Sequence, residues 1–317
     1  MTHRHPRILI TGASGYIGSA LTDEATRRGM EAVRCSRKAP DAPGWFRLEG
    51  LDAAALARVP LQCDAVVHLA GIAHREAAAQ PSDAEYHEVN AVGAESLAKA
   101  ARGRCGTFVL VSSIAALGPG VHRGGAAARP RPASGYGRSK LAAESLVRDA
   151  LAGSTTSLRV VRLPAVHGPA APGAISQLAA WVGHRRPVPS GCDGARRSVI
   201  GIDNACDFLL KAAVDARLDG MTVTPTDGPA PDVLDMARRI ARVRGVRLTV
   251  VPCPRMVLRA AAGVAGIAGP RAAGIRRSLD RLLESHAVED DTVASVVRWV
   301  PPLTLDEGLA RAFGGRA

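Results

Sequence analysis

The chain is poor in aromatic residues, which make up 3% of its 317 residues. A binding platform for single-stranded nucleic acid needs aromatic rings on which bases stack, so this scarcity argues against such a partner. The formal net charge is +12, but nearly all of the basic residues are arginines, they are spread along the chain, and none of the arginine pairs is interleaved with aromatics. We therefore interpret the charge as a compositional bias and expect no nucleic-acid partner.

The cysteines and the apolar runs exclude further classes of protein. Six cysteines are spread without a Cys-x-x-Cys motif or a histidine pair, which argues against a zinc site or a disulfide framework and for a reducing, cytoplasmic environment. An apolar run at residues 260–269 is short for a bilayer span of about 20 residues and predicts a buried helix or a hairpin of helices, not membrane insertion. Residues 1–7 lead directly into the apolar residues 8–10, which leaves no room for a signal peptide.

The first half of the chain alternates short apolar runs with longer segments of helical periodicity. Predicted strands cover residues 8–11, 31–35, 64–69, 108–112 and 158–163, and predicted helices cover residues 16–28, 85–102 and 136–151. This alternation with short connections predicts an α/β fold, a Rossmann-type doubly wound parallel sheet with helices on both faces. Ligands of such a sheet bind at the carboxyl ends of its strands.

The pattern loosens after residue 163, where prolines and glycines interrupt it. Segments that can still be recognised there are strands at 198–202 and 248–251 and helices at 203–216 and 233–243. Before that point, residues 118–134 are predicted to form a long loop. We expect a nucleotide-binding domain over residues 1–165, to which residues 196–228 return. Residues 166–195 and 229–317 would then form a smaller C-terminal substrate-binding lobe.

Three glycines in the pattern Gly12-x-x-Gly15-x-x-Gly18 lie between the first predicted strand and the first predicted helix. Glycines in this context permit a tight turn and let backbone amides approach a pyrophosphate at the helix N-terminus. The motif therefore predicts a bound dinucleotide.

The end of the second predicted strand distinguishes NADP from NAD. It reads Arg34-Cys-Ser-Arg-Lys38, and the next carboxylate is Asp41, whereas an NAD-binding protein usually places an acid here on the ribose diol. The hydroxyl of Ser36 and the cations of Arg37 and Lys38 suit a ribose 2′-phosphate, so we expect NADP, with NAD as the alternative. The other interpretation is that both cations are solvated loop residues.

Tyr136 and Lys140 lie four residues apart in a predicted helix. This spacing places both side chains on one face, where an ammonium beside a phenol favours the phenolate. The pair is a candidate acid/base for moving protons at a hydroxyl or carbonyl carbon. The alternative is an ordinary solvated helix face.

With these features the chain resembles the extended short-chain dehydrogenase/reductase family, the nucleotide-sugar epimerases, dehydratases and reductases. Further segments that support the resemblance are His68-Leu-Ala-Gly71, Asn90, Val111-Ser-Ser113, Arg162-Leu-Pro-Ala-Val-His-Gly-Pro169, Arg197-Ser-Val-Ile-Gly-Ile-Asp203 and Trp299-Val-Pro-Pro-Leu-Thr-Leu-Asp-Glu-Gly308. Within the family the chain is most similar to bacterial enzymes of surface-polysaccharide assembly that act at carbon 4 of UDP-linked N-acetyl sugars, particularly 4-keto-6-deoxy-hexosamine reductases.

The resemblance implies roles for single residues. Ser113 would hydrogen-bond the reacting oxygen, Tyr136 would be the acid/base, and Lys140 would bind the nicotinamide ribose and lower the pKa of the tyrosine. Arg197 would bind the nucleotide diphosphate, unless it is an ordinary surface arginine, and His74 could line the sugar pocket. The expected cofactor contacts, besides Tyr136 and Lys140, are Gly12, Ser14, Gly15, Tyr16, Ile17, Gly18, Ser36, Arg37, Leu69, Ala70, Gly71, Asn90 and Pro164.

Three positions depart from the family pattern. Ile114 and Ala115 stand where family dehydratases carry an Asp-Glu pair, which argues against a 4,6-dehydratase. His167 stands where tyrosine is common, and we expect it to pack under the cofactor without acting as a catalyst. The residue order in Glu49-Gly-Leu-Asp52 also differs from the family pattern. Which of these two acids contacts the adenine, if either does, stays open.

These observations favour a reductase that transfers a hydride from NADPH to the keto carbon 4 of a UDP-4-keto-6-deoxy-N-acetylhexosamine. The first alternative is a UDP-hexose or UDP-N-acetylhexosamine 4-epimerase with bound NAD. The second is a non-catalytic NAD(P)-sensing regulatory protein, which would need the nucleotide but not the acid/base residues.

The predicted helices at 85–102 and 136–151 resemble the pair with which family members form dimers. Apolar positions that could supply a common face are Leu97, Ala98, Ala101, Leu141 and Leu146, although several of them must also pack on the sheet. We therefore expect a homodimer.

Overall fold

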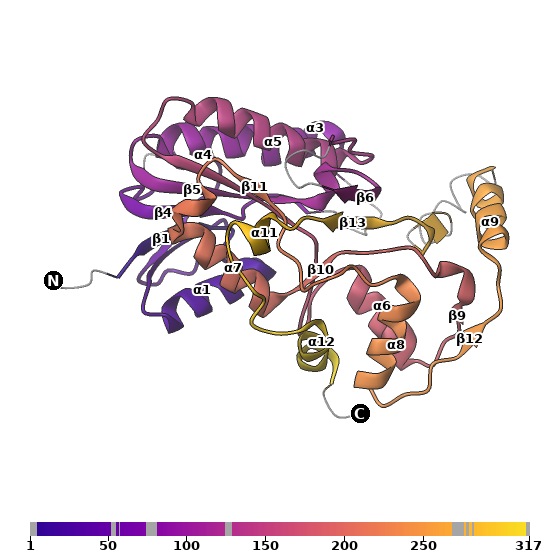
Figure 1. Ribbon diagram of the computed structural model, residues 1–317. Coiled ribbons are helices and arrows are strands. Elements are labelled where there is room, and N and C mark those ends of the chain that lie inside the picture. The colour runs from indigo at the N-terminus through magenta and orange to yellow at the C-terminus, as the bar shows by residue number, and fades with distance from the viewer. Residues whose placement is uncertain are drawn as a thin grey trace.

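The computed structural model describes residues 5–51, 55–56, 58–73, 81–123, 129–267, 276, 279–280 and 282–314. Its centre is a seven-stranded sheet in which all neighbouring strands are parallel (Figure 1). In spatial order the strands are β11 (Thr222–Val223), β7 (Ser157–Leu163), β5 (Cys105–Ser113), β4 (Cys63–His68), β1 (Arg7–Thr11), β2 (Glu31–Ser36) and β3 (Trp45–Arg47). The chain winds outward from β1 in both directions, which confirms the predicted Rossmann-type fold.

Helices cover both faces of this sheet. They are α1 (Tyr16–Arg27) and α7 (Ile202–Val214) on one face, and α4 (Gly93–Ala101) and α5 (Gly135–Leu151) on the other. Leu21 and Phe208 are fully buried on the first face, and Leu97 and Val147 on the second. Helices thus cover the central strands on both sides, which explains why the sequences of these strands are continuous apolar runs.

A second core lies beside the sheet. It is built from α6 (Ala174–Gly183), α8 (Val233–Val243) and α12 (Leu305–Phe313). Three short strand pairs connect distant segments: β8 (Ala165–His167) with β10 (Val199–Gly201), β9 (Val188–Pro189) with β12 (Val250–Val251), and β6 (Gly120–Arg123) with β13 (His286–Glu289). The side chain of Asp232 caps α8 by accepting a hydrogen bond from the backbone of Asp235, as expected at the start of a helix.

The remaining elements are α3 (Asp83–His87), a π-helical turn (Glu88–Val92), the 3₁₀ turns Ile114–Ala116, Ser190–Cys192 and Ala216–Leu218, α9 (Arg255–Ile267) and α11 (Thr292–Ser295). The helix predicted from residue 85 begins two residues earlier, because Ser82 and Glu85 form a capping box. The stretch predicted as a loop contains β6, whose partner β13 lies far away in the sequence. Local periodicity could not reveal that pairing.

The apolar run at residues 260–269 differs from the prediction of a buried helix. Its described part belongs to α9, in which Met256 is 81% exposed and Val264 is 67% exposed. Figure 1 shows α9 at the edge of the molecule, away from the sheet. Within the described residues, no helix combines the length and the apolar character needed to cross a bilayer.

The predicted division into two lobes remains a proposal, with one correction. Residues 229–317 were assigned to the smaller lobe, but Val293, Val297 and Trp299 belong to the core cluster of the sheet. The ring of Trp299 meets Phe208 of α7 edge to face, with 5.0 Å between centroids.

The dimer prediction also needs a correction in its residues. Leu97, Ala98 and Ala101 are fully buried within the subunit and cannot form an interface. Leu141 and Leu146 are half-buried. The homodimer itself stays a prediction.

Candidate active site

The glycine turn lies between β1 and α1, as its motif predicts. Gly12 has a φ of +71°, and a Cβ there would lie 2.8 Å from the backbone nitrogen of Ala70. A Cβ on Gly18 would lie 2.2 Å from the carbonyl oxygen of Gly12. Gly15 precedes α1 without a side-chain cap in the part of the chain described, so the first amides of this helix remain available to an anion.

A cavity of about 610 Å³ opens at this turn. Eight of the predicted cofactor residues line it: Gly12, Ser14, Gly15, Ser36, Arg37, Leu69, Ala70 and Gly71. They come from the carboxyl ends of three neighbouring strands, β1, β2 and β4, which is where a doubly wound sheet binds its ligand. The tight glycine backbone and the free helix N-terminus fit a dinucleotide.

The part of this cavity that is expected to hold the adenosine ribose is formed by residues at and just after the end of β2. The Ser36 hydroxyl is buried and hydrogen-bonded to the hydroxyl of Ser14. Arg37 is exposed and lines the cavity. Lys38 is also exposed, and its backbone N–H donates to Ser36 Oγ at 3.2 Å, but it is not one of the lining residues. Of the two predicted cations, Arg37 is therefore the one placed at the cavity.

Of three further predicted positions, only one lies within the described residues. Glu49 lines the same cavity as Arg37, which favours it as the acid near the adenine. Asp52 and His74 lie outside the described residues.

A second cavity, of about 220 Å³, contains the predicted catalytic residues. Its lining includes Ser113, Tyr136 and Lys140, together with the predicted cofactor residues Ile17 and Pro164. Leu69 and Gly71 line both cavities, so the two are adjacent. The fold thus brings the three predicted catalytic side chains to the edge of the predicted dinucleotide site.

Tyr136 stands in the first turn of α5, which begins there because Ser134 accepts a hydrogen bond from the backbone of Gly137 at 3.1 Å. Burial raises the pKa of Tyr136, a hydrogen bond with the side chain of Ser113 lowers that pKa, and the neighbouring Tyr86 raises it. Burial is the largest of these effects. Ser113 and Tyr136 line the same cavity, and burial favours the protonated phenol of Tyr136.

Lys140 lies one turn further along α5 and is buried. Its Nζ donates to the carbonyl oxygen of Val111 at 3.0 Å and lies 6.0 Å from the centroid of the Tyr136 ring. Burial lowers the pKa of Lys140 to about 8, and the carboxylate of Glu144 opposes that effect. The expected lowering of the Tyr136 pKa by Lys140 stays a prediction.

A buried ion pair behind Lys140 is a feature that sequence reasoning missed. Glu144 accepts hydrogen bonds from Arg162 Nε at 2.9 Å and Nη2 at 2.6 Å, and from the Ser112 hydroxyl at 2.6 Å. All three residues are buried. The only sequence feature that could have indicated this ion pair was the position of Glu144, one turn after Lys140 on the same helix face.

Asn90 lies behind the turn that follows β4. Its Oδ1 accepts the backbone N–H of Ile72 at 2.8 Å, and its Nδ2 donates to Ile72 O and to Ser139 Oγ, both at 3.0 Å. A Cβ on Gly71 would lie 2.6 Å from Asn90 Oδ1. Asn90, carried on the π-helical turn, thus fixes the Gly71 segment onto α5, and it lines neither cavity.

Two other predicted residues line neither cavity. Tyr16 packs against the core on the α1 side, and burial raises its pKa to about 12. His167 is fully buried, with its Nε2 2.8 Å from the carboxylate of Asp227. Asp227 also accepts the backbone N–H of Gly201 at 2.9 Å, which ties β10 to this histidine. A catalytic role for His167 gains no support from this position.

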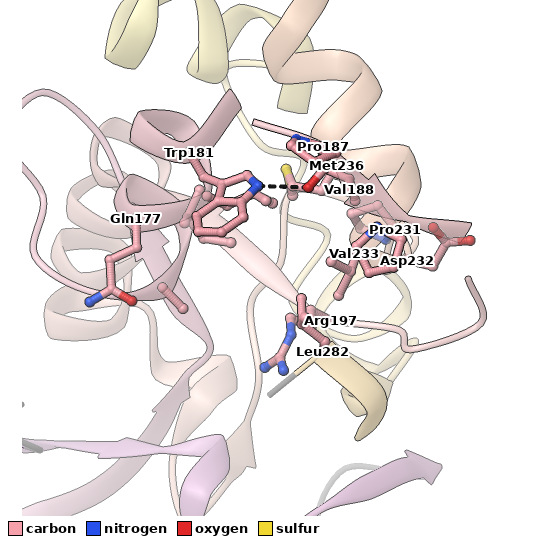
Figure 2. A pocket seen from close by; sticks show the side chains of 14 residues that line it. Gln177, Trp181, Pro187, Val188, Arg197, Pro231, Asp232, Val233, Met236 and Leu282 are labelled. Atoms are coloured by element: carbon pink, nitrogen blue, oxygen red, sulfur yellow. Dashed lines mark hydrogen bonds between the residues drawn. The ribbon is translucent and has the colours of Figure 1, made fainter. Parts of the chain in front are cut away.

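A third cavity, of about 270 Å³, lies between α6, α8 and the strand pair β9–β12 (Figure 2). Arg197 lines it together with largely apolar residues, including Leu178, Trp181, Val188 and Met236. The indole N–H of Trp181 donates to the carbonyl oxygen of Pro187 at 2.9 Å, which fixes the plane of the ring. The guanidinium of Arg186 lies 5.0 Å from the Trp181 ring centroid. Sequence reasoning found Arg197 but missed the apolar wall around it.

A protein-family model described as the NAD dependent epimerase/dehydratase family matches residues 8–220. The chain belongs to this family. It is thus an enzyme of the extended short-chain dehydrogenase/reductase class, and the prediction of a nicotinamide dinucleotide is confirmed at the level of the family.

Three similar proteins illustrate the range of the family. The ceramide reductase of Caulobacter vibrioides is 30% identical over 257 residues, 74% of this chain and 73% of that protein. A 4-hydroxy-2-methyl-3-oxo-4-farnesyl-3,4-dihydroquinoline-1-oxide ketoreductase of Stigmatella aurantiaca is 27% identical over 334 residues, 96% of this chain and 94% of that protein. The solved structure of MoeE5 in complex with UDP-glucuronic acid and NAD superposes with a TM-score of 0.73 at 24% identity, over 97% of each chain.

Proposed function

We propose that this epimerase/dehydratase family member is an NADP-dependent reductase of a UDP-4-keto-6-deoxy-N-acetylhexosamine in surface-polysaccharide biosynthesis. The observation that carries the proposal is the adjacency of two cavities. One has the features of a dinucleotide site, and the other is lined by Ser113, Tyr136 and Lys140. A carbonyl between them would meet both the hydride donor and the proton donor.

Each catalytic side chain has a distinct task in this reaction. Bound NADPH would supply the hydride to carbon 4 of the sugar. Tyr136 would transfer its phenolic proton to the carbonyl oxygen, Ser113 would hydrogen-bond that oxygen, and the ammonium of Lys140 would stabilise the phenolate that remains.

Reduction and epimerisation need different protonation states of Tyr136 at the start of the reaction. A reductase needs the protonated phenol first, and burial raises the pKa of Tyr136 toward that form. A 4-epimerase instead begins by removing a hydroxyl proton, for which the phenolate is needed. A tightly bound, oxidised NAD that copurifies with the protein would favour the epimerase.

The cavity around Arg197 supports a nucleotide-linked substrate. The flat ring of Trp181 and the side chains of Leu178 and Val188 offer an apolar slot for a base. The guanidinium of Arg197 at the same cavity matches the oxygens of a diphosphate. A UDP-sugar would use both parts.

The cofactor preference rests on the end of β2. Ser36 and Arg37 offer a hydroxyl and a cation for a ribose 2′-phosphate, and Glu49 lines the same cavity. We therefore retain NADP as the proposed cofactor, with NAD as the alternative.

A specific observation also favours a second candidate, the reduction of an apolar ketone. The cavity around Arg197 is lined mainly by apolar side chains, and two relatives are named as reductases of ceramide and of a farnesylated quinoline oxide. Such a substrate would occupy the cavity without a diphosphate, so free UDP would not compete with it.

The deciding experiment incubates the protein with UDP-4-keto-6-deoxy-N-acetylglucosamine and NADPH. The loss of absorbance by the reduced nicotinamide and the NMR spectrum of the sugar product are followed together. Turnover that is inhibited by UDP supports the proposal, and Tyr136→Phe is the matched control. Full activity on an apolar ketone, with none on the UDP-sugar, would establish the second candidate.

A further inference from the structure

A basic surface patch lies where the ends of α6 and α8 meet the strand pair β9–β12. Four exposed arginines belong to this α6–α8 patch: Arg185 and Arg186 follow α6, and Arg244 and Arg247 follow α8. A Cβ on Gly183, the last residue of α6, would lie 2.2 Å from Nη1 of Arg244, so the two helix ends are in contact. Figure 1 shows α6, α8 and this strand pair together, at the end of the molecule away from β1.

The charge of the patch is not balanced by carboxylates. Arginines on other surfaces form close ion pairs, as Arg217 does with Asp215 at 2.6 Å, and Arg239 and Arg242 of α8 share Asp306. Among the residues that the structure describes, none of the four patch arginines forms such a pair. Segments 181–192 and 236–255 contain no aspartate or glutamate. The C-termini of α6 and α8 together carry about one negative charge from their dipoles, so four guanidinium groups leave the patch positive.

Apolar side chains are exposed beside these arginines. Trp181 of α6 is 43% exposed, and Val250 and Val251 of β12 are 38% and 42% exposed. The indole N–H of Trp181 donates to the carbonyl oxygen of Pro187, and the residue after Pro187 pairs with Val250. The guanidinium of Arg186 lies 5.0 Å from the centroid of the Trp181 ring. The cationic and the apolar parts of the patch are therefore continuous.

We propose that the α6–α8 patch binds the surface of an anionic membrane. Guanidinium groups at such a surface meet lipid phosphates, and an exposed tryptophan is typical of the headgroup level. Trp181 and Pro187 also line the cavity around Arg197, so a bilayer bound to the patch would lie beside that cavity. The inference goes beyond the proposed function and does not depend on it.

Two other partners fit the patch less well. A nucleic acid would meet the same cations, but the patch offers its bases a single aromatic ring, and the guanidinium of Arg186 already lies over that ring. A second copy of the patch would bring like charges together. A bilayer supplies phosphates for the arginines and, at the same time, an apolar layer for Trp181 and the two valines.

The test is cosedimentation of the full-length protein with sucrose-loaded vesicles at physiological ionic strength. One set contains phosphatidylglycerol and phosphatidylcholine in equal parts, and the other contains phosphatidylcholine alone. The proposal expects binding to the first set and about thirtyfold weaker binding after Arg185→Gln/Arg247→Gln, the loss of two cations at an anionic surface. Within the described residues neither of these side chains forms a hydrogen bond or an ion pair, so the fold should tolerate the change.

The matched control separates this contact from the attraction of a protein with net charge +12 to any anionic surface. It removes two exposed arginines beside the central sheet: Arg104 directly precedes β5, and Arg298 adjoins Trp299 of the sheet core. Arg298 has a φ of +53° and Arg185 a φ of +54°, so the two double variants are also alike in backbone conformation. Arg104→Gln/Arg298→Gln should weaken binding less than about threefold, because salt screens charges that are far from the lipid.

Tryptophan fluorescence tests where the membrane meets the protein. Trp181 is 43% exposed, whereas Trp299 is 6% exposed. Phosphatidylglycerol brominated in its acyl chains near the headgroup should quench the fluorescence of the wild type more strongly than that of Trp181→Phe.

Three results would overturn the proposal: no vesicle binding by the wild type, an equal loss of binding in both double variants, or equal quenching of the wild type and Trp181→Phe. Binding to a DNA duplex that Arg185→Gln/Arg247→Gln abolishes, without binding to vesicles, would assign the patch to nucleic acid and overturn the proposal as well. Thermal unfolding checks that each variant is folded.

Discussion

The ion pair behind the active site allows a test of how Lys140 keeps its proton. Glu144 is the group whose charge raises the pKa of Lys140, against burial, which lowers it to about 8. The same carboxylate is bound by Arg162 at 2.6 Å and 2.9 Å. Replacing Glu144 therefore changes two things, the stability of the core and the protonation of Lys140.

The two effects can be separated by the choice of variant. Removing one partner of a buried ion pair costs roughly 3–5 kcal/mol, a large part of the roughly 5–15 kcal/mol that stabilises a typical domain. Glu144→Gln alone thus risks unfolding. Replacing both charged residues by uncharged residues of similar volume often leaves the free energy of unfolding nearly unchanged. Glu144→Gln/Arg162→Met should therefore remain folded. Glutamine can still accept the hydrogen bond from Ser112.

In the double variant, burial acts on Lys140 without the opposing carboxylate. A nearby opposite charge typically shifts a pKa by about one unit or more, so the pKa of Lys140 should fall from about 8 toward neutrality. Lysine loses its proton as the pH rises through its pKa. The alkaline limb of the kcat/KM profile should therefore move to lower pH by about one unit, with activity retained at acidic pH.

The assay is the pH profile of NADPH oxidation with the keto substrate that proves active, with thermal unfolding recorded at each pH. A folded double variant whose profile coincides with that of the wild type would refute the reasoning. Glu144 would then serve only to neutralise Arg162.

Three other variants and one measurement on the wild type test the remaining assignments. Tyr136→Phe should lower kcat/KM roughly 10²- to 10⁴-fold while leaving cofactor affinity nearly unchanged, and a rate close to that of the wild type would exclude Tyr136 as the acid/base. Ser36→Asp/Arg37→Ala should weaken NADP and help NAD in fluorescence titrations, whereas equal wild-type affinity for both cofactors would remove the argument. Arg197→Ala should raise KM more than it lowers kcat, with a loss in kcat/KM of roughly 10- to 150-fold, and an unchanged KM without competition by UDP would contradict a diphosphate contact. Sedimentation velocity should show a homodimer, and a fully active monomer at micromolar concentration would contradict it.

Local sequence patterns were sufficient to predict the parts of the site that lie within short segments of the chain. Gly18 is required by a contact within one strand–turn–helix unit, and Gly12 has a positive φ in the same turn, so their spacing is visible in the sequence. Tyr136 and Lys140 share one helix, and their separation fixes their common face. The buried strands were visible as apolar runs because helices cover them on both sides.

The missed features join segments that are far apart in the sequence. Glu144 on α5 meets Arg162 on β7, and nothing near either residue in the sequence indicates the other. The strands β6 and β13 are four residues each and pair across most of the chain, so neither has enough local periodicity to be recognised. Pairings of this kind depend on tertiary context, which a single sequence does not provide.

Helix α9 shows a different limit of sequence reasoning. Its inner residues, such as Leu258, and its outer residues, such as Val264, are equally apolar, and a helix that is apolar all round predicts burial. Hydropathy identifies a side chain as apolar, but it does not identify the residues or molecules that cover that side chain. The fold covers the inner face with residues of this chain and leaves the outer face open among the residues described. The prediction of a buried helix was therefore wrong because an apolar sequence shows that a face avoids water, whereas the fold decides whether residues of the same chain cover that face.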